Sequence, residues 1–186
     1  MKQSLFTMEH ARQLTADTYE LVLSGDTSAI TAPGQFVNIQ LPGKFLRRPI
    51  SICNWTKDAL LLLVRVVGEG THDLVRCVPG TELDVLSGLG NGFDLAKGGT
   101  HPILLGGGIG IAPLYGLAQR MLEAGIAPTV GLGFRSGGDA FYLEEFGKLG
   151  CRLMVATEDG SLGTKGFVTD LVRHVPECGY AFVCGP

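Results

Sequence analysis

The pattern of apolar and polar positions differs between the two halves of the chain. In the first half, apolar and polar residues alternate over short segments, as in GQFVNIQLPG, where Val37, Ile39 and Leu41 share one face. Period-two alternation is typical of half-buried β-strands, and many short strands separated by turns predict a small antiparallel β-barrel. The segments with this pattern, or with an apolar run of strand length, are residues 18–25, 34–43, 59–68 and 82–88.

One helix is expected within the barrel half. The segment THDLVRC begins with Thr71, a residue type whose hydroxyl often accepts a hydrogen bond from the backbone at a helix start. We therefore predict a short helix in this segment, with Thr71 as its N-cap.

After Gly99, apolar segments of strand length alternate with segments of helical period. In the first helical segment, Pro113 falls in the first turn, where proline is tolerated, and Gly125 falls just after the end. Strands that alternate with helices predict a parallel sheet. The expected strands are Ile103–Leu105, Thr129–Phe134, Arg152–Ala156 and Ala181–Cys184. The expected helices carry apolar stripes at Leu114, Leu117, Ala118, Met121 and Leu122, and at Val168, Leu171, Val172 and Val175.

Together the two patterns predict an α+β protein of two domains, an antiparallel β-barrel followed by a parallel α/β domain. The pattern changes at Gly98-Gly99, so the predicted domains are residues 1–98 and 99–186. A chain of 186 residues has room for two small domains.

Composition narrows the function classes. The formal net charge of −3 gives no electrostatic case for binding nucleic acid. The five cysteines are widely spaced and form no C-x-x-C, so neither a metal site nor a disulfide framework is indicated, and a reducing cytosol is the natural compartment. The charge-free run from Pro102 to Ala118 is short for a membrane span and is broken by prolines and glycines. We therefore expect a cytoplasmic protein with no nucleic-acid, membrane or metal partner.

The segment GGGIGIAP joins a predicted strand to a predicted helix. Gly108 and Gly110 permit a tight turn and a close approach of the backbone to a pyrophosphate, while Pro113 stands where the fingerprint G-x-G-x-x-G has its third glycine. The turn lacks Gly-Lys-Ser/Thr, which excludes a P-loop. By itself the turn is equally consistent with a tight strand-to-helix connection.

The segment RRPISICN carries polar candidates in the barrel half. With Ile50 and Ile52 buried on one face, we expect Arg48 and Ser51 to project from the other. A guanidinium can donate two parallel hydrogen bonds to one phosphate, and a hydroxyl can hydrogen-bond to a heterocycle. The nearby GEGT is a second candidate anion site. The alternative is a solvated arginine and a serine that bonds to the backbone.

Several motifs in order carry a family resemblance. An R-x-x-S strand, a G-x-G-T helix start, a G-x-G-x-x-P turn and a VCGP end resemble the ferredoxin reductase-like flavoproteins, which join a FAD-binding barrel to an NAD(P)-binding α/β domain. More narrowly, LRRPISI, RVVGEGTHDL, GLGNGFDL, GGGIGIAPL, EDGSLGTKGFVTDLV and VCGP are similar to the electron transfer subunit of NAD-linked dihydroorotate dehydrogenase. The resemblance covers essentially the whole chain.

The resemblance implies a FAD site in the barrel. It places Arg48 on the pyrophosphate and Ser51 beside the flavin edge that carries N5, with Ile50 where many relatives stack a tyrosine. The implied FAD-binding residues are Arg48, Pro49, Ile50, Ser51, Val64, Arg65, Val66, Gly70 and Thr71.

The resemblance also implies a nicotinamide dinucleotide site in the second domain, for NAD(H) as co-substrate. Cys184 is placed beside the flavin, where it and Ser51 flank the reacting atoms. An acid after a strand, Glu158 or Asp159, can bond a ribose or lie solvated in a loop. The implied NAD residues are Gly108, Gly110, Pro113, Asp159, Cys184 and Gly185.

The implied function is electron transfer between NAD and a separate dihydroorotate dehydrogenase catalytic subunit in pyrimidine biosynthesis. The family continues beyond CGP with a four-cysteine segment that binds a 2Fe–2S cluster. This sequence stops at Pro186 and lacks those ligands, and we expect a C-terminally truncated member. A naturally short product and a relative that passes electrons without a cluster are the other readings. Two alternatives stay open: another NAD(P)H-flavin oxidoreductase subunit, of the ferredoxin or hydrogenase reductase type, and a catalytically silent docking module.

Overall fold

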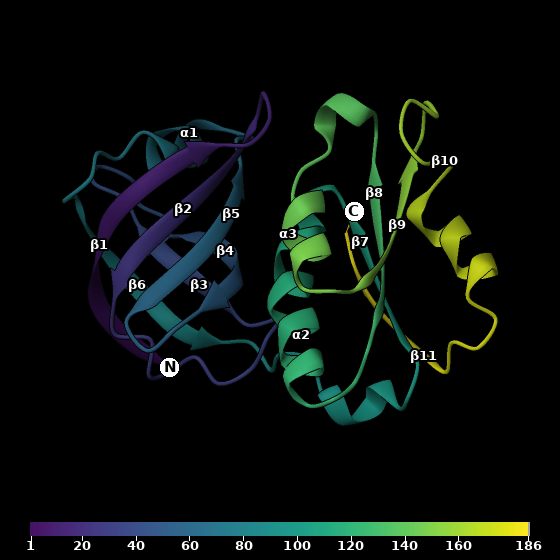
Figure 1. Ribbon diagram of the computed structural model, residues 1–186. Helices are drawn as coiled ribbons and strands as arrows, with labels where there is room; N and C mark the ends of the chain where they lie inside the picture. The colour runs from purple at the N-terminus through teal and green to yellow at the C-terminus, as the bar shows by residue number, and fades with distance from the viewer. Residues whose placement is uncertain (186) are drawn as a thin grey trace. The chain divides into compact units, whose positions relative to one another are not determined.

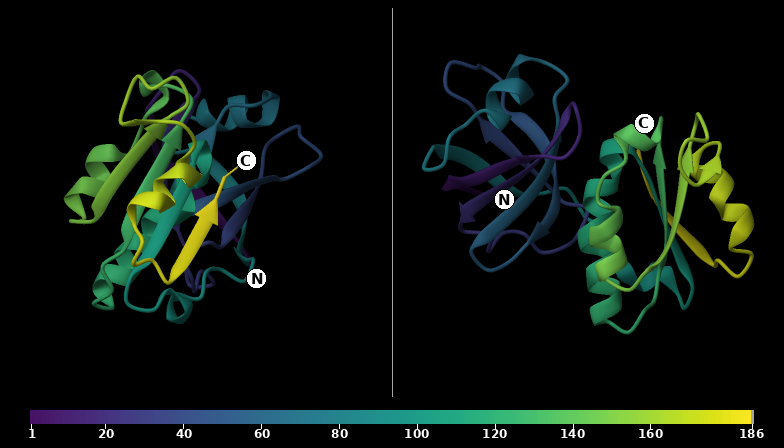
Figure 2. Two further views of the ribbon diagram at one scale, coloured as in Figure 1. Left: turned by 90° about the vertical axis from the view of Figure 1, so that its right-hand side faces the viewer. Right: turned by 45° about the horizontal axis from the view of Figure 1, so that its top comes forward.

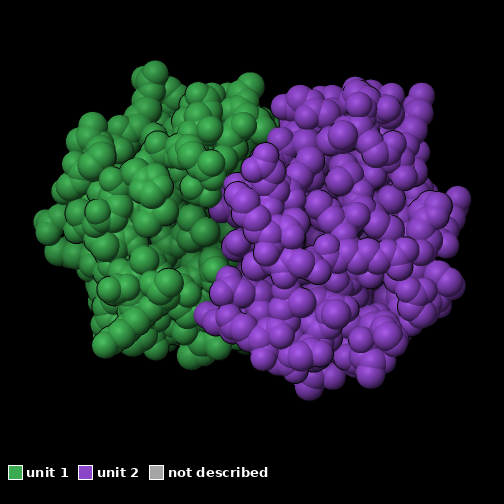
Figure 3. All heavy atoms as spheres, viewed as in Figure 1, with its two compact units in different colours: residues 1–92 green, residues 93–186 purple. Residues whose placement is uncertain are grey.

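The computed structural model describes residues 1–185. The chain divides into two compact units, residues 1–92 and residues 93–186 (Figure 3). Each unit has its own sheet and its own core, and each is described by itself below.

The first unit is a closed barrel of six antiparallel strands in the order β1-β2-β5-β4-β3-β6 (Figure 1). The antiparallel pairing of β1 with β6 closes the barrel. The strands are β1 (Lys2–Gln13), β2 (Thr18–Gly25), β3 (Phe36–Gln40), β4 (Arg48–Trp55), β5 (Ala59–Arg65) and β6 (Glu82–Leu89).

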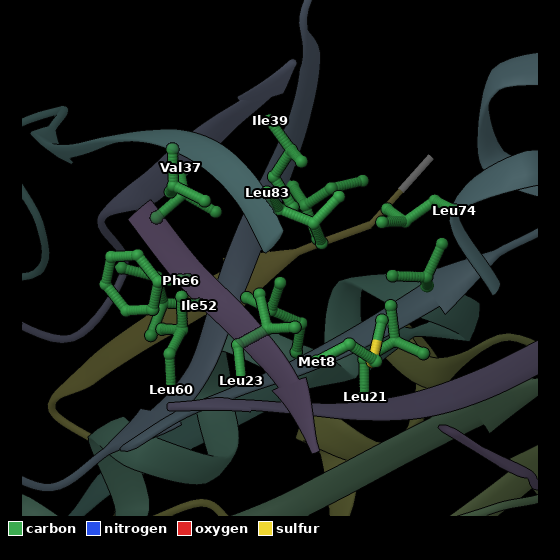
Figure 4. Packing of buried hydrophobic residues seen from close by; sticks show 14 of the residues in the cluster. Phe6, Met8, Leu21, Leu23, Val37, Ile39, Ile52, Leu60, Leu74 and Leu83 are labelled. Carbon is green, nitrogen blue, oxygen red and sulfur yellow. The ribbon is translucent and has the colours of Figure 1, made fainter. Parts of the chain in front are cut away.

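The barrel interior is filled by apolar side chains from every strand. Phe6 and Met8 from β1 meet Leu21 and Leu23 from β2, and all four are fully buried (Figure 4). Val37 and Ile39 of β3 are also fully buried, as their alternation predicts. The helix α1 (Glu69–Val75) adds Leu74 to the same core.

The expected N-cap of α1 was wrong. Gly68 is the N-cap, and Thr71 is the third residue of the helix. The Thr71 hydroxyl accepts hydrogen bonds from the backbone N–H groups of Val67 (2.9 Å) and Gly68 (3.3 Å). A threonine at the N-cap and a threonine at the third position both bond backbone groups at the helix start, so the residue type alone does not distinguish them.

An ion pair joins the segment before β4 to β6. Arg47 Nη2 lies 2.8 Å from Asp84 Oδ2, and Arg47 Nη1 donates to the Asp84 carbonyl oxygen at 3.0 Å. The hydrogen bonds from Arg47 lower the pKa of the Asp84 carboxyl below its ordinary value of 3.8. The paired guanidinium thus stabilises the ionised form of Asp84 in the folded barrel.

Replacing Asp84 by asparagine will lower the free energy of unfolding of the barrel by about 1 kcal/mol at neutral pH. Because the folded-state pKa of Asp84 is depressed, its contribution is complete above pH 3.8 and is lost as the pH falls through the folded value. Urea unfolding followed by the fluorescence of Trp55, the single tryptophan and a residue of β4, measures it. A difference between wild type and variant that stays constant well below pH 3.8 would contradict this assignment.

The second unit is a five-stranded parallel sheet in the order β10-β9-β8-β7-β11. The helices α2 (Ala112–Glu123) and α3 (Leu143–Lys148) cover one face, and the 3₁₀ segment Val168–His174 covers the other (Figures 1 and 2). The strands are β7 (Pro102–Gly107), β8 (Thr129–Phe134), β9 (Arg152–Thr157), β10 (Thr164–Lys165) and β11 (Tyr180–Cys184). Three further short 3₁₀ segments are Leu95–Gly98, Gly108–Ile111 and Gly137–Asp139.

The four strands expected in this half are all present, and the parallel sheet is confirmed. In α2 the residues Leu114, Leu117, Ala118 and Met121 are fully buried, and Leu122 is half-buried. Gly125 follows the helix with φ of 78°, the left-handed conformation that glycine adopts without strain.

The last expected helix differs from its predicted form. Val168–His174 is a 3₁₀ helix, in which residues three apart share a face. Leu171 is therefore buried and Val168 partly buried against the sheet, while Val172 is 39% exposed.

The segment just before Gly98-Gly99 packs within the second unit. The Phe93 ring meets the Phe182 ring of β11 edge to face, with 5.8 Å between centroids. A Cβ at Gly98 would also contact Met121 and Phe182. The division between the units accordingly lies at Gly92, before this segment rather than after it.

No helix within residues 1–185 is long and apolar enough to cross a membrane.

Candidate functional site

Two motifs of the barrel half meet at one point. The Arg48 side chain, from the first residue of β4, lies over Gly70 in the first turn of α1. A Cβ built on Gly70 would come within 1.8 Å of Arg48 Nε, so the arginine occupies the space that any other residue's side chain would fill. Arg48 Nη1 also donates to the Leu46 carbonyl oxygen at 2.7 Å. The guanidinium is thus held, partly exposed, beside the buried backbone of Gly70.

The expectation that Arg48 and Ser51 share a face of β4 was wrong. Strand side chains alternate with a period of two, so Arg48 belongs to the register of Ile50 and Ile52, which point into the barrel. Ser51 and Pro49 are exposed on the outer face. Arg48 reaches Gly70 because it is the first residue of the strand, at the rim of the barrel.

Several residues named by the resemblance are engaged in the barrel itself. The Ile50 and Val64 side chains are 9% and 1% exposed and pack in the barrel core, which leaves their backbone as the part that can face a ligand. Thr71 holds the backbone at the start of α1. These residues can shape a binding surface without exposing their side chains to it.

Arg65 and Val66 lie at the far end of β5. Arg65 Nε donates to Asp17 Oδ2 at 2.7 Å. Burial raises the pKa of Asp17, but hydrogen bonds from Arg65 and the neighbouring threonines outweigh it, so the net pKa is lowered. Val66 lines a cavity of about 260 Å³ between the β1–β2 turn and α1. The lining residues are Ala16, Asp17, Tyr19, Val66, His72, Val75 and Arg76.

The glycine turn of the second unit contacts the last strand of the sheet. A Cβ on Gly110 would lie 2.3 Å from the Cys184 carbonyl oxygen and 2.7 Å from the Gly185 Cα. Gly108 has φ of 50° and opens the 3₁₀ segment that leads into α2, and Pro113 is buried in the first turn of that helix. The structure therefore brings Gly108, Gly110 and Pro113 together with Cys184 and Gly185.

This contact lies where the strand order reverses. From β7 the chain moves outward through β8, β9 and β10, then returns to β11 on the other side of β7. In open parallel sheets such a reversal leaves a crevice at the carboxyl ends of the two central strands, where ligands bind. The Gly108–Ile111 turn follows β7 and Cys184 ends β11, so both border this switch point.

Cys184 is half-buried beside the glycine turn. Burial raises the pKa of its thiol above the ordinary value of 9.0, so the thiol is protonated at neutral pH. A neutral thiol is a small apolar neighbour rather than a nucleophile.

A cavity of about 290 Å³ opens at the carboxyl ends of β7, β8 and β9. Glu158, which directly follows β9, lines it, and Phe167, whose side chain is 64% exposed, stands at its edge. Sequence reasoning did not identify Phe167, although GTKGFVTD belongs to the motif that carries the family resemblance. The lining residues are Gly107, Gly133, Phe134, Glu158, Gly166, Phe167, Val168 and Thr169.

The two adjacent acids differ in their surroundings. Asp159 Oδ1 accepts hydrogen bonds from the Ser161 backbone N–H (2.9 Å) and hydroxyl (2.6 Å), which lower the pKa of Asp159. Glu158, by contrast, faces the cavity. The structure therefore distinguishes a turn-forming acid, Asp159, from a cavity-facing one, Glu158.

The sequence matches curated relatives over its whole length, although no family model matches it. It is 39% identical over 194 residues to the electron transfer subunit of NAD(+)-dependent dihydroorotate dehydrogenase B from Listeria monocytogenes. The subunits of the same name from a Geobacillus strain and from Shouchella clausii are 40% and 41% identical. All of this chain is covered, together with 74–76% of each relative. The chain belongs to this family of electron transfer subunits.

Solved structures confirm the fold of this electron transfer subunit. The structure of an NADH-dependent reduced ferredoxin-NADP oxidoreductase, described in connection with flavin-based electron bifurcation, superposes with a TM-score of 0.88 at 30% identity. The match covers 98% of this chain and 68% of that one. The Amycolatopsis cytochrome P450 reductase has a TM-score of 0.86 at 24% identity and shares the fold, with 100% of this chain and 62% of that chain covered.

Proposed function

We propose that this subunit binds FAD on its barrel, accepts NAD(H) at the switch point of its sheet, and passes electrons between NAD and a dihydroorotate dehydrogenase catalytic subunit in pyrimidine biosynthesis. The observation that carries the proposal is the Arg48 guanidinium held over Gly70. It supplies a fixed cation beside a bare backbone, the combination that a pyrophosphate requires.

The barrel residues fit FAD in distinct ways. Arg48 binds the pyrophosphate, and the absent side chain of Gly70 leaves room for both the guanidinium and a phosphate oxygen. Ser51, exposed on the outer face of β4, can donate its hydroxyl hydrogen to the heterocycle. Val66 lines the cavity between the β1–β2 turn and α1, which we assign to part of the ligand. The proposed FAD residues are Arg48, Pro49, Ile50, Ser51, Val64, Arg65, Val66, Gly70 and Thr71.

The second unit receives the nicotinamide dinucleotide. Gly108 and Gly110 let the backbone approach the pyrophosphate, Pro113 fixes the first turn of α2, and Cys184 with Gly185 forms the opposite wall. FAD, when bound here, would exchange a hydride with the nicotinamide and pass electrons on singly. The contribution of this chain is to bind and orient the two ligands, and the protonated Cys184 keeps charge away from the wall that it forms.

An acidic residue at the cavity that Glu158 lines discriminates between NAD and NADP. The sequence favours Asp159 as one candidate, and we propose that Glu158 contacts the ribose while Asp159 holds the turn. A carboxylate can accept hydrogen bonds from ribose hydroxyls and repels the additional phosphate of NADP.

Replacing Glu158 by glutamine will raise kcat/KM for NADPH relative to NADH by about tenfold, because one repulsive charge is removed from the cavity. Steady-state reduction of an artificial acceptor with each dinucleotide measures the ratio. The matched control is Asp159→Asn, which loosens the turn and is expected to lower both values together. An unchanged ratio in the Glu158 variant would show that this cavity does not receive the ribose.

The described residues do not fit a 2Fe–2S cluster. None of the five cysteines forms a disulfide bond, and no three His, Cys, Asp or Glu side chains within residues 1–185 gather as metal ligands. No electron-transfer step is therefore assigned to a cluster on these residues.

The first experiment is a visible spectrum of the purified chain, followed by anaerobic addition of NADH. Flavin absorbance that NADH bleaches supports both sites. Flavin that NADH does not bleach supports the barrel site and contradicts the switch-point site. A colourless protein that takes up no added FAD contradicts the proposal and leaves a docking module.

A further inference from the structure

A second cation, Lys44, joins the loop before β4 to the helix α1. Lys44 Nζ lies 2.8 Å from Glu69 Oε2 and 3.1 Å from Asp73 Oδ2, one helical turn further on. Its side chain is only 23% exposed, whereas that of Glu69 is 88% exposed. The hydrogen bonds that Lys44 donates to Glu69 and Asp73 raise the pKa of Lys44, so its charge persists across the physiological range. We call Lys44, Glu69 and Asp73 the loop–helix tether.

The tether and the Arg48–Gly70 contact bridge the same two elements. The loop between β3 and β4 runs from Leu41 to Arg47. Lys44 is its middle residue, and Arg48, four residues later, is the first residue of β4. On the helix, Glu69 directly precedes Gly70. A loop fixed to α1 at Lys44 therefore holds Arg48 near Gly70. Without the Lys44 ion pairs, the loop has one fewer contact with the helix.

Apolar packing contributes little to fixing the tip of this loop. Phe45 and Leu46, at its tip, are 97% and 65% exposed, so they contribute little packing that would keep the loop in place. Arg48 nevertheless uses the Leu46 carbonyl oxygen as a hydrogen-bond acceptor. Lys44 joins the segment that carries this acceptor to α1 through its ion pairs with Glu69 and Asp73.

We propose that the loop–helix tether is a positioning device for FAD, in which Lys44 holds the loop against α1 and so holds Arg48 over Gly70. Lys44 acts through Arg48 and need not contact the ligand. The inference rests on the proposed function, since it assumes that Arg48 binds the FAD pyrophosphate.

The direction in which FAD affinity changes in a double variant of Glu69 and Asp73 distinguishes positioning from simple electrostatics. Glu69 and Asp73 are carboxylates beside the proposed site of an anionic pyrophosphate. If charge alone mattered, replacing them by Gln and Asn would strengthen FAD binding, because two repulsive charges are removed. If they anchor Lys44, the same change weakens FAD binding.

The experiment measures the FAD dissociation constant of flavin-stripped protein by quenching of flavin fluorescence. Lys44→Met and the pair Glu69→Gln with Asp73→Asn are each expected to raise it about three- to fivefold, the scale of an exposed ion-pair network. The triple variant is expected to lose no more FAD affinity than Lys44→Met or the Glu69 and Asp73 pair alone, because each change breaks the same tether. Lys44→Arg keeps the charge and is expected to restore most of the affinity.

The matched control is Lys2→Met, which removes a lysine that pairs with Asp26 elsewhere on the barrel unit. It is expected to leave FAD affinity unchanged. In an Arg48→Gln background, Lys44→Met should have no further effect, because the group through which it acts is gone. Circular dichroism of each apoprotein establishes that the barrel is folded.

Three results would contradict the positioning role of the tether without contradicting the proposed FAD site. These are unchanged affinity in Lys44→Met, tighter binding when Glu69 and Asp73 are neutralised, and full additivity with Arg48→Gln. A wild-type protein that does not bind FAD would instead refute the proposed function itself.

Discussion

Replacing Arg48 by glutamine will raise the FAD dissociation constant about a hundredfold and leave the stability of the apoprotein nearly unchanged. A guanidinium that binds a phosphate makes charge-assisted hydrogen bonds, and truncating such a partner costs about 2–5 kcal/mol of binding free energy. In the free protein the same side chain bonds the Leu46 carbonyl oxygen and covers Gly70. Loss of these partly exposed contacts is expected to change the free energy of unfolding by less than about 0.5 kcal/mol.

The neighbouring arginine provides the matched control. Arg47 is committed to Asp84, so Arg47→Gln is expected to lower the stability of the barrel without changing the FAD affinity of the folded protein. Fluorescence titration with FAD and thermal unfolding of both variants separate the two roles. The assignment fails if both variants lose FAD equally, or if Arg48→Gln binds as wild type does.

Gly70→Ala is a second variant that is expected to weaken FAD binding through Arg48. The new Cβ would displace the Arg48 Nε, and because that atom lies near the end of a flexible side chain, the arginine can move aside. The variant is therefore expected to fold, to bind FAD weakly, and to lose no further affinity when Arg48 is also replaced.

Replacing Gly110 by alanine will slow the reduction of bound flavin by NADH at least about a hundredfold. The added Cβ would meet the Cys184 carbonyl oxygen at 2.3 Å, and backbone on both sides prevents the clash from being relieved by a side-chain rotation. The turn and β11 must separate, which removes the wall of the proposed nicotinamide site. Overpacking of this kind costs about 1–3 kcal/mol, and a misplaced substrate-positioning group can cost about a hundredfold in rate.

The control for stability is Gly125→Ala. Gly125 also lies in the second unit, and its φ of 78° makes alanine unfavourable, but no atom lies within 4 Å of the added Cβ. We expect it to lower the melting temperature without slowing hydride transfer. Stopped-flow absorbance under anaerobic conditions gives the rates, and the barrel should retain FAD in both variants. Reduction of the Gly110 variant at the wild-type rate would place the nicotinamide elsewhere.

Much of the strand content could be predicted because most strands bury one or both faces. Thr18–Gly25 and Thr129–Phe134 have the same bounds in the sequence prediction and in the structure, since both are bordered by turn residues and carry many buried side chains. β1 was not predicted because only Phe6 and Met8 of its twelve residues are buried. β10 was not predicted because its two residues are both exposed.

The site was predictable in its motifs and not in its geometry. Gly110 and Cys184 are distant in sequence and meet only because β11 returns beside β7, a strand order that no local pattern encodes. The choice between Glu158 and Asp159 depends on a turn hydrogen bond to Ser161. The loop–helix tether joins charged side chains of a loop and a short helix, which leave no periodic signal in the sequence.

The order of the strands along the chain also sets an order during synthesis. All strands of the barrel lie before residue 90, so the barrel can close, and its arginine can settle over Gly70, while the rest of the chain is still being translated. The switch point needs β11, whose residues 180–184 leave the ribosome after every other strand within residues 1–185. The proposed flavin site is therefore complete in the nascent chain before the proposed nicotinamide site.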